Sequence, residues 1–436
     1  MQKFDMAKYR VGGDERICVV GLGYVGLPLF IALSKRFEVV GYDIDSKRVD
    51  ELNKGIDRTR SVEYEDLICN SRKFYNTISQ VPRSNVYIIT VPTPVDSSKN
   101  PDLTAIDSAA LSVASVLNNN DLVILESTVY PGLTLNHVVP IIEKKAGLKL
   151  KTEEDACVPG FYIGYSPERI NPGDYEHTFE TTTKIVSGHG LYALDKVASI
   201  YESVVTAGVH RVASVPTAEA AKVIENIQRD VNIALVNELA LLFYDMGISI
   251  KEVLQAAQTK WNFIDFQPGF VGGHCIGVDP YYLLHAAKKI NFYPAVIDAG
   301  RSINDGMVLG VFMRFLEYLA SRKVSLVDKS VLVCGVTFKA NCNDTRNSQS
   351  ERIIDLFRKY GSNVCACDPW VAPGHDGICT VYNEVNDISN FDIIVFTVDH
   401  DEFKEKISLY RNMASASCII ADFKGFLNPI DVDWCI

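Results

Sequence analysis

The sequence of 436 residues lacks the features that mark membrane and secreted proteins. No run of about 18 apolar residues is present, so we expect no membrane-spanning helix. The most apolar helical stretch, residues 233–244, is interrupted by Asn237 and Glu238. No apolar segment with a cleavage site follows the first Met, so we expect no secretory signal and a cytoplasmic protein.

The sequence also lacks an excess of positive charge and any closely paired cysteines. Lys and Arg total 43 against 54 Asp and Glu, a net charge of −11, which disfavours a nucleic-acid partner but permits a local basic pocket for an anion. The 11 cysteines include no CxxC pair, and the closest spacing is Cys365-Ala366-Cys367. We therefore expect reduced thiols and no metal site.

What the sequence has is an alternation of short apolar runs with helical patterns. Strands are expected at residues 17–20, 86–90, 122–125, 161–165 and 184–186, and again at 331–333, 364–366, 393–396 and 418–421. Helical patterns, such as residues 106–117 and 350–360, separate several of them. This alternation predicts an α/β fold with two Rossmann-like, doubly wound parallel sheets.

A different pattern occupies the middle of the chain. Residues 217–245 contain neither Gly nor Pro, and apolar residues recur at helical spacing. A helix of about 29 residues would be roughly 43 Å long. We expect it to join the two α/β domains and to form a subunit contact in a homodimer. The expected domains are an α/β domain at residues 1–210, a central helical domain at 211–320 that contains the long helix, and a second α/β domain at 321–436.

The first glycine-rich segment is a candidate dinucleotide site. Gly21, Gly23 and Gly26 form a G-x-G-x-x-G that follows a predicted strand and opens a helix, with Tyr24 and Val25 between them. Asp43 ends the next strand, where a carboxylate accepts from ribose hydroxyls and favours NAD over NADP. Arg48 is expected to contact the adenosine. The alternative is a glycine-rich turn in a protein that binds no nucleotide.

Polar residues at the ends of other predicted strands are further candidates, because these ends line the ligand crevice of an open α/β sheet. Thr93, Ser127 and Thr128 follow two such strands, and the Thr128 hydroxyl is expected to reach the cofactor or a catalytic water. A threonine at a strand end is as often without function. Glu168 is either a general base or the partner of Arg169.

Residues 268–280 place four glycines around Cys275, which predicts an accessible thiol in a loop with close backbone approach or positive φ. The neighbouring His274 is expected to pack rather than to act as a base. Lys222 and Asn226 lie at i and i+4 of the long helix, where together they would stabilise an oxyanion. The alternative is a solvated lysine beside a polar residue.

Taken together, these motifs closely resemble the UDP-sugar 6-dehydrogenases, the family of UDP-glucose dehydrogenase. The resemblance covers nearly the whole chain. It rests on residues 21–28, Ser127-Thr128-Val129, Ser166-Pro167-Glu168-Arg169-Ile170, Lys222 with Asn226, Gly272-Gly273-His274-Cys275 with Asp279, and residues 335–339 with Asp344 and Arg346.

The resemblance implies a four-electron oxidation of a sugar C6 alcohol with two NAD⁺, through a thiohemiacetal and a thioester on Cys275. It implies that Lys222 and Asn226 stabilise the oxyanion, that Asp279 and Thr128 hold a water, and that Glu168 assists thioester hydrolysis. Arg346 would lie near the cofactor. Arg301 is either a substrate contact or part of a structural ion pair. The implied substrate-binding residues are Glu168, Arg169, Ile170, Asn171, Lys222, Asn226, Phe270, Gly272, Gly273, Arg301, Phe338 and Lys339, the last two meeting the UDP moiety.

Residues 92–96, 168–174 and 272–280 resemble the UDP-N-acetylhexosamine branch that serves capsule, Vi-like and O-antigen polysaccharides. UDP-glucose enzymes commonly carry Lys in place of Val278, and an Arg where this chain has Thr259-Lys260-Trp261-Asn262. We expect UDP-GlcNAc or UDP-GalNAc as substrate, with UDP-glucose as the alternative. Two rival classes are a two-electron β-hydroxyacid-type dehydrogenase, which needs no Cys275, and a nucleotide-sugar sensor, which would be expected to lose Cys275 or Lys222.

Overall fold

The computed structural model describes residues 15–59, 61–69, 73–152, 158–170, 178–273, 275–375, 379–385 and 387–436. The chain divides into two compact units. The first comprises Met1–Glu225 and Tyr281–Ile290, and the second comprises Asn226–Pro280 and Asn291–Ile436.

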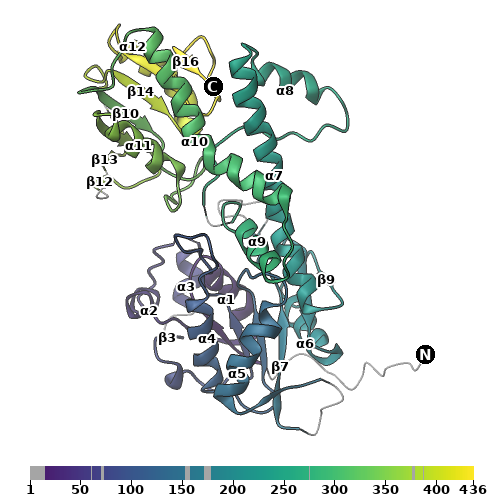
Figure 1. Ribbon diagram of the computed structural model, residues 1–436. Coiled ribbons are helices and arrows are strands. Elements are labelled where there is room, and N and C mark those ends of the chain that lie inside the picture. The colour runs from purple at the N-terminus through teal and green to yellow at the C-terminus, as the bar shows by residue number, and fades with distance from the viewer. Residues whose placement is uncertain are drawn as a thin grey trace. The chain divides into compact units, whose positions relative to one another are not determined.

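The first unit is built on a parallel sheet with the strand order β3-β2-β1-β4-β5-β7-β8-β9, in which β6 pairs with β7 and only β7 and β8 run antiparallel among the described strands (Figure 1). The strand order reverses direction between β1 and β4, the position where open α/β sheets bind ligands. Its strands are β1 (Arg16–Val20), β2 (Glu38–Tyr42), β3 (Phe74–Tyr75), β4 (Val86–Ile89), β5 (Leu122–Leu125), β6 (Lys149–Leu150), β7 (Gly160–Tyr165), β8 (Lys184–Gly188) and β9 (Val209–Arg211). Its helices are α1 (Gly26–Ser34), α2 (Ser46–Asn53), α3 (Tyr64–Cys69), α4 (Thr104–Ala114), α5 (Val139–Ala146) and α6 (Leu191–Glu202), with a π-helical turn at Thr134–Val138 before α5.

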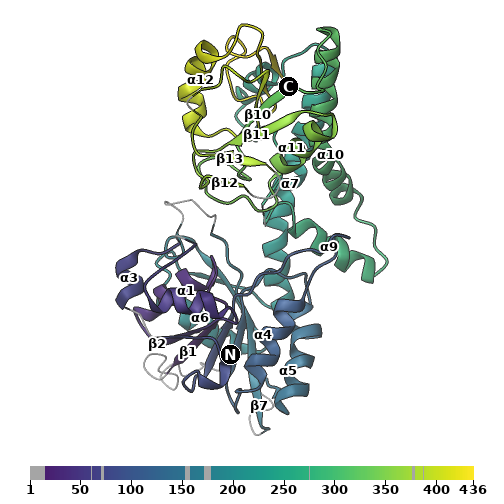
Figure 2. The same ribbon diagram turned by 90° about the vertical axis from the view of Figure 1, so that its left-hand side faces the viewer.

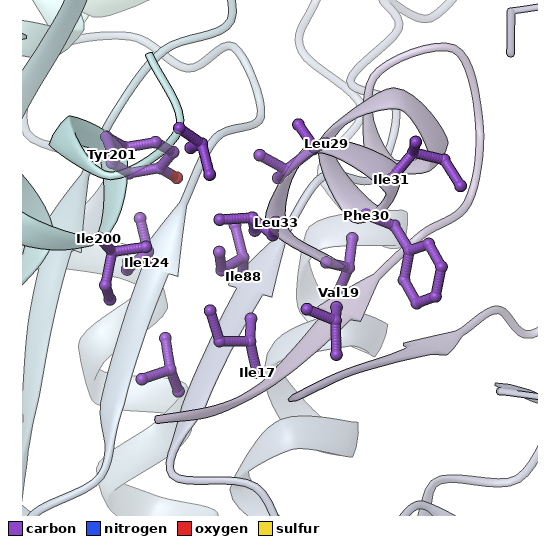
Figure 3. Packing of buried hydrophobic residues seen from close by; sticks show 14 of the residues in the cluster. Ile17, Val19, Leu29, Phe30, Ile31, Leu33, Ile88, Ile124, Ile200 and Tyr201 are labelled. Carbon is purple, nitrogen blue, oxygen red and sulfur yellow. The ribbon is translucent and has the colours of Figure 1, made fainter. Parts of the chain in front are cut away.

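Helices on both faces explain why the central strands are apolar throughout rather than alternating. On one face, Ile17 and Val19 of β1 pack with Leu29 and Leu33 of α1, and Ile200 and Tyr201 of α6 cover the neighbouring strands (Figure 3). Cys18 and Val20 of β1 point to the other face and are equally buried. The sheet is therefore a rigid support for the loops at its carboxyl edge.

Four helices follow, namely α7 (Val215–Asp245), α8 (Ile250–Gln258), α9 (Asp279–Lys289) and α10 (Ala295–Ser321). The long helix predicted at residues 217–245 is confirmed as α7. Helix α10 lies in the region expected to be helical, although its bounds were not predicted and Gly300, Gly306 and Gly310 disfavour a helix in isolation. In the fold Gly310 lets α10 approach α7, since a Cβ there would lie 2.8 Å from a Leu241 side-chain carbon.

The second unit holds a sheet with the order β12-β13-β11-β10-β14-β15-β16, parallel except for β12 and β13 among the described strands (Figure 2). Helices α10 and α11 cover the face that carries Val331 and Val333, and α12 covers the face that carries Leu332 and Cys334. The elements are β10 (Ser330–Cys334), α11 (Gln349–Lys359), β11 (Asn363–Cys367), β12 (Gly374–His375), β13 (Thr380–Tyr382), β14 (Ile393–Phe396), α12 (Asp401–Met413), β15 (Ile419–Asp422) and β16 (Trp434–Cys435).

Both sheets are doubly wound, so the predicted fold class is confirmed. Among the described residues, none of the helices combines the length and apolar character needed to cross a bilayer. Nor do those residues bring three or more His, Cys, Asp or Glu side chains together in a way that would hold a metal ion.

Candidate active site

The loop after β1 has the geometry of a dinucleotide-binding turn. Gly21 adopts φ +92°, which favours glycine, and its carbonyl accepts from the Thr90 hydroxyl at 2.7 Å. Gly26 begins α1 so close to this turn that a Cβ there would lie 1.8 Å from the Gly21 carbonyl oxygen. At Gly23, by contrast, a Cβ would meet nothing within 4 Å. The turn is therefore packed tightly from behind and open at the position predicted to face a pyrophosphate.

The start of α1 is free to bind an anion. Neither a side-chain cap nor an acidic residue lies in its first turn, so its amide groups are available to phosphate oxygens. Asp43 lies at the end of β2 and accepts from the Leu22 amide at 2.8 Å and from the Asp45 amide at 2.9 Å. Each carboxylate oxygen retains acceptor capacity for a ribose hydroxyl. These residues fit NAD.

Arg48 has protein partners on the Gly21 turn and on the segment after α2. Its guanidinium is buried, donates to the Leu22 carbonyl at 2.9 Å and pairs with Asp57 at 2.8 Å. Its first role is thus to support the Gly21 turn, and an adenosine contact stays a prediction. Tyr24 and Val25 are at least partly exposed on the same turn, as is Thr93 after β4. Ser127 is buried and donates to the Val91 carbonyl at 2.7 Å, whereas Thr128 is partly exposed.

Glu168 belongs to a buried charge cluster that the sequence did not predict. The Lys184 ammonium lies 3.0 Å from one Glu168 oxygen and 2.9 Å from Glu126, and Tyr201 donates to the other Glu126 oxygen. The Lys184 and Glu126 side chains are 3% and 0% exposed. Burial raises the pKa of Glu126, whereas the Lys184 cation and two backbone amides hold the pKa of Glu168 below its usual value against the effect of burial.

The proposed pairing of Glu168 with the Arg169 side chain is wrong. The Arg169 guanidinium pairs with Glu225 at 2.7 Å and donates to the Thr183 carbonyl at 2.8 Å. Only the Arg169 and Ile170 backbone amides donate to Glu168, at 2.7 and 2.8 Å. The partner of Glu168 is Lys184 of β8. This pairing was not predicted because the two residues are far apart in the sequence. Asn171, also predicted to bind substrate, lies outside the described residues, as does His274.

The predicted nucleophile lies in the turn that leads into α9. Cys275 is exposed, and its carbonyl accepts from the amide of Asp279, the first residue of α9, at 2.9 Å. Cys275 therefore lies in the turn just before the N-terminus of α9, the end of a helix that favours negative charge. Asp279 is buried and accepts from the Asn226 side chain of α7 at 2.5 Å. Asn226 and the Cys275 turn are thus joined through Asp279.

Lys222 precedes Asn226 by about one turn on α7, so both side chains leave the helix from one face. Lys222 is 8% exposed, and its ammonium has no hydrogen-bond or ion-pair partner in the part of the chain that the structure describes. The side chain is therefore mostly covered, whereas its ammonium is not among the fully buried groups of the described residues, and its contact with an oxyanion stays a prediction.

Two of the four glycines in the Cys275 loop are explained by contacts with residues 335–349. Gly273 has φ +75°, and a Cβ there would lie 2.7 Å from the Phe338 ring. A Cβ at Gly272 would lie 2.6 Å from the Asn347 carbonyl oxygen. The Gln349 amide also donates to the Val271 carbonyl at 3.0 Å. Phe270 and Phe338 together line a small hollow beside this contact. The predicted nucleophile loop and the predicted UDP loop are therefore packed together.

Two arginines complete the predicted set. Arg301 is buried, pairs with Asp230 at 2.9 Å and Asp305 at 3.0 Å, and donates to the Ile276 carbonyl at 3.3 Å. Of its two interpretations, the structure supports the ion pair, which steadies the turn after Cys275. Burial raises the pKa of Asp230 to about 6 despite this arginine. Arg346 pairs with Asp344 at 2.6 Å, and the Lys339 ammonium lies 5.7 Å from the Phe338 ring centroid.

Comparison with known proteins identifies the family. Models of the UDP-glucose/GDP-mannose dehydrogenase family match the chain in three parts: its NAD binding domain over residues 15–205, its central domain over 216–306 and its UDP binding domain over 332–429. The chain belongs to this family. NAD is therefore its cofactor, and the predicted resemblance is confirmed.

Several relatives match over nearly their full length. The chain is 43% identical over 424 residues to Protein CapL of Staphylococcus aureus, covering 96% of this chain and 98% of that one. It is 44% identical over 421 residues to the UDP-N-acetyl-D-glucosamine 6-dehydrogenase of Pseudomonas aeruginosa, covering 95% and 98%. The solved structure of a UDP-D-ManNAc dehydrogenase from Pyrococcus horikoshii matches with a TM-score of 0.84 and 31% identity, covering 96% and 98%.

Proposed function

We propose that the protein oxidises the C6 alcohol of a UDP-N-acetylhexosamine to the uronic acid in two NAD-dependent steps, through a thiohemiacetal and a thioester on Cys275. The observation that carries this proposal is an exposed Cys275 in a turn whose Asp279 is held by Asn226, the residue that follows Lys222 by one turn of α7. A two-electron dehydrogenase has no use for such a thiol.

The balance of the reaction assigns a task to each residue. The C6 alcohol loses a hydride and a proton to become an aldehyde, and the Cys275 thiol adds to that aldehyde. The thiohemiacetal loses a second hydride and a proton to become a thioester, which water cleaves to the acid and the free thiol. Lys222 and Asn226 donate to the developing oxyanion, and Asp279 and Thr128 hold the water that exchanges protons.

When bound, NAD⁺ accepts the hydride in each oxidation. The Gly21 turn, the open position at Gly23 and the uncapped start of α1 would hold its pyrophosphate, and Asp43 its ribose. Glu168 stays ionised near neutral pH because Lys184 lies beside it. It is therefore a weaker base than a carboxylate with a raised pKa, but one that is always available for the hydrolytic water.

We further propose the gluco epimer as the substrate. Relatives at 44% identity carry the name UDP-N-acetyl-D-glucosamine 6-dehydrogenase, and Val278 replaces the lysine of UDP-glucose enzymes. Relatives named UDP-N-acetyl-D-mannosamine dehydrogenase are less similar, at 34% identity or below. Nine described cysteines are free thiols, which supports a reducing compartment such as the cytoplasm.

The test is an NADH assay on the purified chain with UDP-GlcNAc, UDP-GalNAc, UDP-ManNAc and UDP-glucose, followed by mass spectrometry of the products. We expect two NADH per molecule of UDP-GlcNAc and an N-acetylglucosaminuronate product. Cys275→Ala should form no uronic acid. Turnover of UDP-glucose alone would overturn the substrate proposal, and uronic acid from Cys275→Ala at the wild-type rate would overturn the thioester.

A homodimer is part of the proposal. Leu235 and Leu242 of α7 are 56% and 48% exposed and lie two turns apart, and Leu309 and Met313 of α10 are 50% and 43% exposed. Apolar side chains spaced in this way along long helices form a strip that a second copy of the chain would cover. Sedimentation should give the mass of a dimer, and Leu235→Asp should give a monomer. A monomeric wild-type protein at micromolar concentration would refute this part.

A further inference from the structure

The two sheets share a loop device at their switch points, although the sequence shows no repeat. Gly335 follows β10 with φ +102°, as Gly21 follows β1 with φ +92°. The Thr397 hydroxyl donates to the Gly335 carbonyl at 2.6 Å, as Thr90 donates to Gly21. Asp368 accepts from the Val336 amide at 2.7 Å, as Asp43 accepts from the amide after Gly21. Each sheet thus has a glycine turn, a threonine hydroxyl that donates to the glycine carbonyl, and a carboxylate that accepts from the amide after the glycine.

The two glycine turns differ in the groups that hydrogen-bond to the carboxylate. Asp43 is partly exposed and bound only by backbone amides, so ribose hydroxyls have room to approach. Asp368 is fully buried, and one of its oxygens accepts from the Val336 and Thr337 amides and lies 3.1 Å from Nε2 of His400. His400 therefore occupies at Asp368 the place that a ribose would take at Asp43.

The helix that follows each turn differs as well. Helix α1 begins five residues after Gly21 and has no side-chain cap. Helix α11 begins 14 residues after Gly335, and Ser348 caps it by accepting from the Ser350 amide at 3.2 Å. The start of α11 therefore does not offer uncapped amides to a pyrophosphate in the way that α1 does. The nucleotide of the second unit must be met by the longer loop itself, which carries Phe338 and Lys339.

His400 holds this loop at two places. Its Nδ1 accepts from the Asn341 amide at 3.0 Å, and its Nε2 lies 3.1 Å from the Thr337 hydroxyl. Thr337 donates its only hydroxyl proton to the Lys339 carbonyl at 2.9 Å, so it accepts from His400. Asp368 also only accepts. All these bonds are satisfied by one neutral tautomer, with the proton on Nε2.

The loop turns at Asn341, the residue whose amide donates to His400. Asn341 has φ +55°, a left-handed conformation that Asn adopts more readily than other non-glycine residues. Its side chain donates to Asp401 at 2.6 Å and accepts from the Asp401 amide at 3.2 Å. Residues 337–341 are therefore hydrogen-bonded to His400 and to the start of α12. Phe338 and Lys339 lie between the two residues, Thr337 and Asn341, that bond to His400.

We propose that His400 is a positioning residue for the nucleoside diphosphate of the substrate, which fixes residues 337–341 in the shape that presents Phe338 and Lys339 to UDP. This inference rests on the proposed function, because it takes UDP as the ligand of that loop. The histidine replaces a ribose at the carboxylate of a duplicated nucleotide-binding turn, so the second unit binds a nucleoside diphosphate in a mode other than that of NAD.

Three variants of the full chain separate the two hydrogen bonds between His400 and the loop. His400→Leu removes both hydrogen bonds. His400→Asn keeps an acceptor near the position of Nδ1, and His400→Gln keeps a donor near that of Nε2. Calorimetric titration with UDP alone measures binding without turnover. We expect His400→Leu to weaken UDP about ten-fold or more and to raise KM for the UDP-sugar equally, with kcat and the KM for NAD within about three-fold. The UDP affinities of His400→Asn and His400→Gln should lie between those of the wild type and His400→Leu.

Two controls distinguish positioning from a structural role. Asp43→Ser should weaken NAD and leave UDP affinity unchanged, the reverse of His400→Leu. The exposed His210 of β9 provides a matched histidine, and His210→Leu should change neither affinity. A folded His400→Leu protein with a lower Tm but UDP affinity within two-fold of wild type would overturn the proposal. If that variant does not fold, wild-type UDP affinity in both His400→Asn and His400→Gln would overturn it. Wild-type protein that binds no UDP would instead overturn the proposed function.

Discussion

Replacing Lys184 with methionine should destabilise the first unit strongly, because it removes the only described cation between two buried carboxylates. Methionine keeps the length of the side chain and can pack against the Phe179 and Tyr201 rings, whose centroids lie 5.0 and 5.2 Å from the ammonium. The change therefore removes the charge and little of the packing.

The magnitude follows from the burial of all three groups. Removing one partner of a buried ion pair costs about 3–5 kcal/mol, since it leaves an uncompensated charge. Here the Glu126 and Glu168 side chains, 0% and 11% exposed, would lose the same cation. For a unit of this size each kcal/mol lowers Tm by about 2–4 °C, so we expect a fall of roughly 6–20 °C. Lys184→Met/Glu126→Gln should regain about 1 kcal/mol or more, because one of the two facing carboxylates is gone.

The dependence on pH provides a second readout. In the wild type the pKa of Glu168 is lowered, so its contribution to stability is present above about pH 4.3, the ordinary pKa, and is lost as pH falls below it. Without Lys184, burial and mutual repulsion raise the pKa of both carboxyls, and the native variant takes up a proton. The stability difference between variant and wild type should therefore narrow as pH falls from 8 to 5.

Calorimetric unfolding measures both effects, and addition of NAD identifies the transition of the first unit by raising its Tm. A Lys184→Met protein that loses less than about 1 kcal/mol would refute the reasoning, because a buried ion pair would then contribute no more than a surface one. A double variant whose losses simply add would also refute it.

Other predictions follow from single contacts. Gly26→Ala places a Cβ against the Gly21 carbonyl oxygen and should lower stability by about 1–3 kcal/mol and abolish NAD binding, measured by unfolding and titration. Asp43→Ser removes the acceptor of two amides and should weaken NAD about ten-fold or more; unchanged affinity in a titration would remove Asp43 from the ribose site. Glu168→Gln should slow thioester hydrolysis about 10²-fold or more and accumulate an acyl-enzyme visible by intact mass; unchanged steady-state turnover would exclude Glu168 from that step.

Local patterns in the sequence were sufficient to predict the fold. The apolar runs at residues 17–20, 122–125 and 393–396 lie in strands covered on both faces. Such strands are apolar at every position, so a continuous apolar run predicts them without an alternation of apolar and polar residues. The bounds of helix α10 were not predicted, because Gly310 is favourable in that helix only against Leu241 of α7, a contact between residues about 70 positions apart. Intrinsic propensity and tertiary packing point in opposite directions there, and packing decides the structure.

The candidate site was predictable where chemistry is carried by neighbours in the sequence. Lys222 and Asn226 share a helix face, as their spacing indicated, whereas Asp279, which shares a turn with Cys275, was named only through the family resemblance. The partner of Glu168 was not predictable in this way. Lys184 begins a later strand, and its residue type suggests an exposed position, so only the pairing of β7 with β8 places it beside the carboxylates.

The duplicated turn was hidden from the sequence for a related reason. Twenty-two residues separate Gly21 from Asp43, whereas 33 separate Gly335 from Asp368, so no fixed period links the two devices. What is repeated is a set of hydrogen bonds around one backbone turn, and the intervening loops are free to change length. In the first unit the short loop leaves a helix start and a carboxylate open for a dinucleotide. In the second, the helix begins 14 residues after Gly335, Ser348 caps the helix, and His400 lies against the carboxylate, so we expect the same turn to support a loop with ligand groups of its own. We therefore expect one fold to provide two nucleotide sites of different kinds, as a UDP-sugar dehydrogenase requires.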